Sequence, residues 1–323
     1  MKSYSRIFFL TLIFIASVLT VKIWGGKISS PKVSALATVK NVLEGAGGDI
    51  NQESPVVDKT FVSEIASTGN FSENPTSTLK FASEGICSEV EFSSRAILVE
   101  YLNQNNSVAE INSTRRWPIA SITKLITAVV AVENIDPEIP ITLTDKALKT
   151  EGDAGNFKSV QTFKANDLIK AMLLLSSNDA AMALSEAFGQ DKFLALMRGK
   201  LKEVGMEETS LYEPTGLSPK NQSTPRDIAK LMRYLYNYHP EILKITRTPK
   251  DTAYETKTRT RQVLVNINKF AGQSSFIGGK TGFINDSGGN LVSLFNVRGQ
   301  PVVIIVFGSN DRFKESEQIL ECI

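Results

Sequence analysis

The sequence predicts an α+β fold, in which an antiparallel sheet is flanked by helices and a helical lobe is inserted between its strands. Two strand-like hairpins carry this prediction. One falls early, at residues 95–102 and 107–111, and the other falls late, at residues 289–296 and 301–307. The block between them contains mostly helical runs. This order gives a sheet made by both ends of the domain, with a cleft between the sheet and the inserted lobe.

The first 24 residues predict a membrane anchor or a signal segment. Lys2 and Arg6 precede an uncharged run, residues 7–21, which has the length of a signal-peptide core and is short for a full membrane span. No small-x-small cleavage site follows the run, and Trp24 suits a membrane interface. We therefore favour an uncleaved anchor over a cleaved signal.

Residues 25–83 predict a flexible linker, because they are rich in Ser, Thr, Gly, Asn and mixed charge. The folded domain is expected at residues 84–323, and about 240 residues suffice for one core with two lobes. The net charge of +2 gives no reason to expect a nucleic-acid partner. One histidine, His239, and two cysteines cannot form a usual zinc site.

Apolar runs and their caps predict helices in the rest of the domain. They cover residues 125–132, 168–175, 179–187, 225–238 and 313–323. The clearest start is Pro225, which suits the first helical position, with Asp227 in the first turn.

Three short strings occur in order beside these elements: Ser121-Ile-Thr-Lys124, Ser176-Ser-Asn178 and Lys280-Thr-Gly282. A lone Ser-x-x-Lys carries little information, because residues 29–32 and 77–80 match it without partner strings. The match at Ser121 differs because an apolar helical run follows it. On a helix, residues three apart share a face, so the Ser121 hydroxyl and the Lys124 amine can meet.

This pairing suits nucleophilic catalysis. A serine hydroxyl is a poor nucleophile until a base takes its proton, and a lysine is such a base only if burial and neighbouring cations lower its pKa. The apolar helix supplies the burial. Ser176 and Asn178 fall on a turn between two helices, where side chains point into a cleft.

The third string follows two glycines and is expected on an edge strand beside the cleft. There Lys280 offers positive charge, Thr281 offers a hydroxyl group, and Gly282 leaves room for a substrate backbone.

Together the three strings resemble the motifs of penicillin-binding proteins and serine β-lactamases, and most of all those of the D-alanyl-D-alanine carboxypeptidases of peptidase family S11. Further matching strings are Leu174-Leu-Ser-Ser-Asn-Asp-Ala-Ala181, Glu213-Pro-Thr-Gly-Leu217, Ser223-Thr-Pro-Arg-Asp227 and Asn266-Ile-Asn268. The resemblance runs from about Arg95 to the C-terminus. It implies the β-lactamase/transpeptidase-like fold, with residues 84–323 as a serine DD-peptidase domain.

The resemblance also implies roles for the catalytic residues. Ser121 attacks the carbonyl between two D-alanines of a peptidoglycan stem peptide, with Lys124 as general base, and water hydrolyses the acyl-enzyme. Ser176 relays a proton to the leaving amine. Asn178 holds Lys124 and the substrate amide.

For substrate binding, the resemblance implies that Lys280 and Thr281 bind the terminal carboxylate while Gly282 lets the substrate approach. The backbone N–H groups of Ser121 and Phe283 form the oxyanion hole. No metal or organic cofactor is needed, and β-lactam antibiotics are expected as covalent inhibitors. Peptidoglycan lies outside the cytoplasmic membrane. We therefore expect the enzyme on the outer face of the cytoplasmic membrane if it is anchored, or in the periplasm or the medium if its N-terminal segment is cleaved.

Three departures from the family pattern leave alternatives open. Ser177 replaces the more frequent glycine and either narrows the cleft or faces away from it. Glu213 stands where many relatives carry Asn or Asp, at roughly the spacing of the deacylating glutamate of class A β-lactamases. Phe283-Ile-Asn285 resembles the endopeptidase branch. A DD-endopeptidase is therefore the main alternative, ahead of a β-lactamase or a catalytically silent wall-binding protein.

Cys87 precedes the first strand and Cys322 lies in the last helix, so the proposed fold brings them together. In an oxidising envelope they either form a disulfide, stabilising the fold by ~4 kcal/mol in the chain-entropy model, or stay as two thiols.

Overall fold

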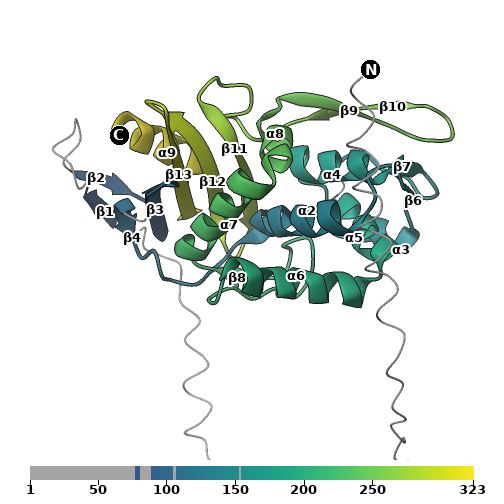
Figure 1. Ribbon diagram of the computed structural model, residues 1–323, viewed down its shortest axis with the longest axis horizontal. Coiled ribbons are helices and arrows are strands. Elements are labelled where there is room, and N and C mark those ends of the chain that lie inside the picture. The colour runs from purple at the N-terminus through teal and green to yellow at the C-terminus, as the bar shows by residue number, and fades with distance from the viewer. Residues whose placement is uncertain (1–76, 81–88, 105–106, 153) are drawn as a thin grey trace, which may run out of the picture. The chain divides into compact units, whose positions relative to one another are not determined.

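The computed structural model describes residues 77–80, 89–104, 107–152 and 154–323 (Figure 1). The chain divides into two units, Met1–Gly69 and Asn70–Ile323, and all described residues lie in the second. Among these residues, no helix has the length and apolar character needed to cross a membrane. The predicted anchor, residues 1–24, lies outside them.

A five-stranded antiparallel sheet joins the early and late parts of the domain, as predicted. Its order is β11-β12-β13-β3-β4, so β11 is an edge strand. The early strands are β3 (Ala96–Tyr101) and β4 (Ser107–Ile111). The late strands are β11 (Phe276–Ile284), β12 (Gly288–Val297) and β13 (Gln300–Ser309). The two sets meet where β13 pairs with β3, for example at Ile304↔Val99.

The alternation of side chains along β13 divides the apolar core between the two faces of the sheet. Val303 and Ile305 belong to the core shared with the helical lobe. Ile304 and Val306 belong to a second core, shared with helix α9 (Arg312–Glu321). Because both faces are covered, these strands read as continuous apolar runs. Each fully buried side chain of this size contributes roughly 1.5–3 kcal/mol.

Beside the sheet lies the predicted helical lobe, in which α2 is enclosed by the other helices (Figure 1). Its longer helices are α2 (Thr123–Asn134), α4 (Ala165–Leu174), α5 (Asn178–Phe188), α6 (Gln190–Val204), α7 (Pro225–Tyr238) and α8 (Pro240–Arg247). Its shorter elements are η1 (Ala120–Ile122), α3 (Asp145–Leu148), β5 (Trp117–Pro118), β6 (Pro140–Thr142), β7 (Thr162–Lys164) and β8 (Gln222–Ser223). Helix α7 has the predicted bounds, and Thr224 caps it by accepting the Asp227 N–H at 3.1 Å.

Two hairpins were not expected from the sequence. The first joins β9 (Lys250–Tyr254) to β10 (Arg261–Val265) and lies against α4. The second joins β1 (Ser77–Lys80) to β2 (Glu89–Phe92). Because β1 falls inside the predicted linker, 25–83, that prediction is wrong at its C-terminal end. The reason is Leu79, which is fully buried in the second core although its neighbours in sequence are polar.

Cys322 is buried at the end of α9, with 6% of its surface exposed. Cys87 lies outside the described residues, so the disulfide between them stays a prediction.

Candidate active site

Ser121 and Lys124 lie where the short turn η1 leads into α2. Ser121 is in the 3-10 turn and Lys124 is in the first turn of the α-helix. The predicted contact between them is present, because the Lys124 Nζ lies 2.9 Å from the Ser121 Oγ. Ala120, just before the serine, has φ of +48°, a conformation that costs energy in a residue other than glycine. Ser121 therefore follows a sharply turned backbone.

Lys124 is fully buried and has three polar neighbours. Besides Ser121, its Nζ contacts the Asn178 Oδ1 at 2.6 Å and the Thr215 carbonyl oxygen at 2.6 Å. A neutral amine has two N–H groups and one lone pair. If the two N–H groups are donated to Asn178 and Thr215, the lone pair faces the serine hydroxyl.

Burial lowers the pKa of Lys124 from 10.5 to about 7, and the Glu213 carboxylate opposes part of this shift. A buried ammonium loses its hydration, so the neutral form gains population. At neutral pH a large fraction of Lys124 is therefore free amine and able to accept a proton.

The middle string spans the turn between α4 and α5. Ser176 has φ of +62°, and its Oγ accepts a hydrogen bond from the Lys280 Nζ at 2.9 Å. Ser177 is buried and is the N-cap of α5, accepting the Ala180 N–H at 3.2 Å, so its hydroxyl serves the helix cap. Asn178 follows this cap, and its Nδ2 donates to the Glu151 carbonyl at 2.6 Å. The asparagine is thus a bridge to Lys124 rather than a helix cap.

The third string lies on edge strand β11, as predicted. Lys280 is 2% exposed, and its Nζ donates to Ser176 and to the Thr281 carbonyl at 3.0 Å. Burial lowers the pKa of Lys280 well below its ordinary value, and the positive charges of Lys124 and Arg312 add to this shift. Lys280 is therefore buried, and among the described residues its hydrogen-bond partners are a hydroxyl and a carbonyl rather than an anion.

Gly282 brings β11 against the nucleophile. A Cβ on this residue would lie 2.8 Å from the Ile119 carbonyl oxygen and 3.2 Å from the Ser121 nitrogen. Any side chain here would push the strand away from η1. Phe283, the next residue, leaves 61% of its surface exposed, and its strand partner is Gly289 on β12.

The structure thus brings the predicted site residues into one region. Ser121, Lys124 and Asn178 form one hydrogen-bonded group, while Ser176 and Lys280 form a second. The backbone at Gly282 approaches Ser121 and joins the two groups in space. Both groups lie at the junction of the sheet with the helical lobe.

Two contributors to the site were not found from the sequence. The Thr215 carbonyl holds Lys124, but a backbone oxygen has no signature in a sequence. The Arg312 Nη1 donates to the Gly282 carbonyl at 2.6 Å, from the first residue of α9. The closing helix was predicted, but nothing in its sequence indicated contact with β11.

His239 and the acidic side chains of the described residues give no sign of a second site. His239 lies between α7 and α8, as expected of a helix-end residue, with its ring nitrogens 3.0 Å from Glu133 and 2.9 Å from Glu241. Within the described ranges, no group of three or more His, Cys, Asp or Glu side chains could hold a metal ion.

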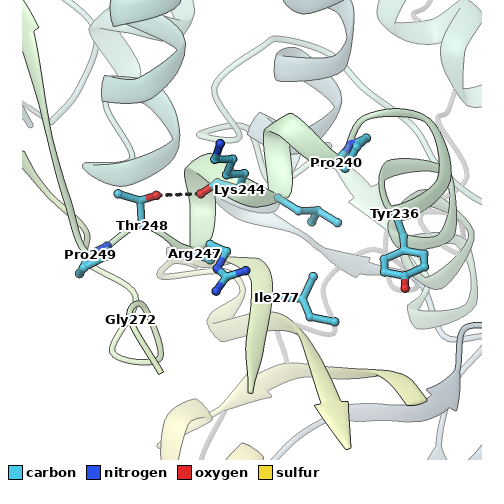
Figure 2. Close-up of a pocket in the computed structure, with 9 residues that line it drawn as sticks. Tyr236, Pro240, Lys244, Arg247, Thr248, Pro249, Gly272 and Ile277 are labelled. Carbon is cyan, nitrogen blue, oxygen red and sulfur yellow. Dashed lines mark hydrogen bonds between the residues drawn. The ribbon is translucent and has the colours of Figure 1, made fainter. Parts of the chain in front are cut away.

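A hollow of about 520 Å³ lies between α8 and β11 (Figure 2). Lys244 and Arg247 come from α8, and Ile277 comes from the start of β11. Its lining includes none of the residues of the three strings. The hollow is therefore separate from the hydrogen-bonded groups around Ser121 and Lys280.

Known proteins are similar to this chain over most of its length. The family described as D-alanyl-D-alanine carboxypeptidase, peptidase S11, matches residues 85–311. A D-alanyl-D-alanine endopeptidase of Escherichia coli (strain K12) is 30% identical over 264 residues, which cover 76% of this chain and 82% of that protein. The D-alanyl-D-alanine carboxypeptidase DacC of the same strain is 29% identical over 259 residues, covering 74% of this chain and 63% of that protein.

Among solved structures, penicillin-binding protein D2 of Listeria monocytogenes in its cefotaxime-bound form is similar to this chain. The TM-score is 0.64, the identity is 28%, and the match covers 72% of this chain and 98% of that one. The predicted α+β fold of the penicillin-binding proteins is thereby confirmed.

Proposed function

Since this chain belongs to the D-alanyl-D-alanine carboxypeptidase family S11, we propose that it removes the terminal D-alanine from peptidoglycan stem peptides through an acyl-enzyme on Ser121. One observation carries this proposal. The Lys124 amine lies 2.9 Å from the Ser121 hydroxyl in a buried site that brings its pKa to about 7. A serine peptidase that lacks a catalytic histidine needs such a base.

The first step is acylation. Lys124 takes the Ser121 proton as the Oγ–carbon bond forms at the carbonyl of the penultimate D-alanine. The carbon–nitrogen bond then breaks, and a proton reaches the leaving amine through Ser176. The Lys280 Nζ, at 2.9 Å from the Ser176 hydroxyl, orients that relay. Water next attacks the ester, which releases the shortened peptide and restores the serine hydroxyl.

Substrate binding uses the buried lysine of β11, Lys280. Lys280, with Thr281, binds the terminal carboxylate, which supplies the anion that the empty site lacks. Asn178 holds the substrate amide, and the N–H groups of Ser121 and Phe283 stabilise the oxyanion. Each such donor is typically worth ~3 kcal/mol. The closeness of Gly282 to Ser121 supports this oxyanion site.

The test is labelling with a fluorescent penicillin and mass spectrometry of the adduct. Ser121→Ala should abolish labelling and the release of D-alanine from a pentapeptide stem. Ser77→Ala is a matched control, because Ser77 and Lys80 repeat the Ser-x-x-Lys spacing on β1, and it should keep both activities. An adduct on a peptide lacking Ser121 would refute the assignment.

A DD-endopeptidase is the second candidate, supported by the name of the 30% identical Escherichia coli relative and by Phe283-Ile-Asn285. A pentapeptide stem and a cross-linked dimer should be compared as substrates. Free D-alanine from the pentapeptide supports the carboxypeptidase, whereas cleavage of the dimer alone supports the endopeptidase. Persistent penicillin labelling, rather than rapid loss of the label, argues against a β-lactamase. A silent wall-binding protein would bind muropeptides without being acylated.

We further propose that the enzyme works outside the cytoplasmic membrane, held by its N-terminal segment. The support is the uncharged run at residues 7–21, preceded by Lys2 and Arg6. The full chain should fractionate with membranes, and a variant lacking residues 1–24 should not when it is expressed behind a cleavable signal. Recovery of the mature full chain in the soluble fraction, starting after residue 24, would favour a cleaved signal instead.

A further inference from the structure

Glu213 is held by its own turn. One oxygen, Oε2, accepts hydrogen bonds from the Thr215 N–H at 2.6 Å and the Thr215 hydroxyl at 2.5 Å. The other, Oε1, accepts from the N–H groups of Gly216 at 2.8 Å and Ser218 at 3.2 Å, and from the Asn221 Nδ2 at 3.0 Å. With five donors around it, this carboxylate is poorly placed to hold a hydrolytic water. The sequence spacing that resembled a β-lactamase glutamate does not carry that role here.

The turn that Glu213 organises, residues 213–218, contacts Lys124 and lies against the backbone just before Ser121. The Thr215 carbonyl accepts the Lys124 Nζ at 2.6 Å, and the Pro214 carbonyl accepts the Thr127 hydroxyl at 2.7 Å. Gly216 has φ of +89°, and a Cβ there would lie 2.0 Å from the Ala120 carbonyl oxygen. The turn is therefore fitted against the backbone that leads into Ser121.

Asn221 adds a second connection between Glu213 and this region. Its Nδ2 group lies 2.9 Å from the Glu213 carbonyl oxygen and 3.2 Å from the Thr123 hydroxyl. Its backbone carbonyl accepts the Ile119 N–H at 2.9 Å. The carboxylate, the turn and the first residues of α2 thus form one continuous hydrogen-bonded unit.

We propose that Glu213 is a positioning residue for the acylation base: its carboxylate sets the turn so that the Thr215 carbonyl aims the Lys124 amine at Ser121. This inference rests on the proposed function and adds a residue to it. The Thr215 carbonyl and the Asn178 oxygen occupy the two N–H groups of the neutral amine. If the carbonyl moves, the lone pair loses its fixed direction toward the hydroxyl.

The charge of Glu213 acts on the same group. Its negative field favours the protonated form of Lys124 and so raises the lysine pKa against the larger effect of burial. Replacing the carboxylate by an amide removes this field, so the free amine should persist to lower pH. A carboxylate whose field does not reach Lys124 would produce no such change in pH dependence, and the fall of the plateau reports the loss of positioning.

Glu255 offers a matched control. It is 3% exposed and also serves its own turn, accepting hydrogen bonds from the Lys257 N–H, the Thr258 hydroxyl and the Thr162 N–H at 2.9, 2.7 and 3.0 Å. That turn lies in the β9–β10 hairpin, and none of these partners contacts Ser121 or Lys124. Glu255→Gln therefore removes a comparable buried carboxylate without touching the base.

The experiment measures the second-order rate constant of acylation by a fluorescent penicillin as a function of pH. The fraction of molecules that becomes labelled gives the concentration of active protein. For Glu213→Gln we expect the high-pH plateau to fall at least about 10-fold, because the base is misdirected. We also expect the midpoint of the acid limb to move down by about half a pH unit. Glu213→Asp keeps the charge but shortens the reach, so its plateau should fall while its midpoint stays near that of the parent chain. Glu255→Gln should match the parent in both.

The outcomes separate the two proposals. If the parent chain is not labelled, or if Ser121→Ala is still labelled, the proposed function fails and this inference fails with it. If the parent is labelled and Glu213→Gln shows the plateau and midpoint of Glu255→Gln, the inference alone is overturned. If Glu213→Gln does not fold, the Glu213→Asp variant tests the inference. A high-pH acylation rate equal to that of the parent would show that the length of the side chain does not matter, and the inference would be overturned.

Discussion

The start of α2 and the edge strand β11 each hide a lysine, and the two lysines are prepared for opposite tasks. Lys124 has a carboxylate in its electrostatic surroundings and two oxygens, besides Ser121, that hold its amine. Lys280 has the cations Lys124 and Arg312 near it and donates to a hydroxyl and a carbonyl. Both pKa values fall because of burial, but only Lys124 is balanced near neutrality. If Lys280 binds the substrate carboxylate as proposed, the difference teaches that the site of Lys124 is complete before substrate arrives, whereas the site of Lys280 is completed by it.

The comparison resolves an apparent conflict. Lys280 is proposed to bind a carboxylate as a cation, yet burial favours its neutral form in the empty site. A bound carboxylate would supply the missing opposite charge and restore the ammonium. Substrate binding should therefore raise the pKa of this lysine.

The strongest way to break the comparison is to remove the base. Lys124→Met should slow acylation by about 10³-fold, because general-base catalysis contributes a factor of that order. In the parent chain the rate should rise with pH through a midpoint near 7, where Lys124 loses its proton. Lys170 lies on α4 and pairs with Asp167 and Asp251. Lys170→Met should leave the acylation rate and the midpoint unchanged. A Lys124→Met enzyme that kept the midpoint near 7 would locate the base elsewhere.

Removing the anion site should affect binding more than chemistry. Lys280→Met should raise the KM for a pentapeptide stem by about 30- to 100-fold, since a charge-assisted contact to the carboxylate is lost. The parent should discriminate strongly against a stem peptide whose C-terminus is amidated, and the variant should not. Equal discrimination by both enzymes would assign carboxylate recognition to another group. Steady-state kinetics with the two peptides measures this.

The same variant should stabilise the empty protein. Because the folded-state pKa of Lys280 lies below its unfolded value, the native state binds fewer protons and charging this lysine opposes folding. Lys280→Met should raise the free energy of unfolding at pH 7 by about 1–4 kcal/mol. The gain should shrink as the pH rises toward 10.5, where the lysine is neutral in the unfolded chain as well. Denaturant unfolding at pH 7 and pH 10 measures both values, and a loss of stability at pH 7 would contradict the argument.

The smallest effect is expected at Ser177, which lies between Ser176 and Asn178. Ser177→Ala should cost about 1 kcal/mol of stability, because it removes the N-cap of α5. The acylation rate should change less than twofold, since Asn178 keeps its bond to Lys124. Ser177→Asp, which retains a capping oxygen, should recover part of the loss. A large drop in the rate of Ser177→Ala would show instead that this serine lines the cleft.

The sequence was most informative where chemistry and periodicity coincide. The three strings, the helix Pro225–Tyr238 and the late hairpin were predicted because each combines a local signal with a fixed spacing. Ser121 illustrates the limit of such reasoning. Its contact with Lys124 was expected from a helical face, but it is made from a 3-10 turn after a strained alanine. The spacing of residues predicted the neighbour, and tertiary packing determined the backbone.

What could not be predicted depends on contacts between distant segments. The Thr215 carbonyl has no side-chain signature, and Arg312 reaches Gly282 only because α9 packs beside the sheet. The β9–β10 hairpin buries just Ala253 and Leu264 among its strand residues, too few to give a clear alternation. Leu79 is the one apolar residue of β1, and it is buried only because distant strands form a core for it. Local sequence carries no record of such partners.

The pairing of β13 with β3 has a consequence for biogenesis. The registered partners Val302 and Tyr101 stand about 200 positions apart, so the central sheet cannot close until the residues of β13 have been synthesised. Early segments must wait, exposed to proteases and to chaperones, for strands made last. A nascent chain stalled before residue 300 would consequently hold Ser121 and Lys124 without β13, the strand that joins the early pair β3–β4 to the late pair β11–β12.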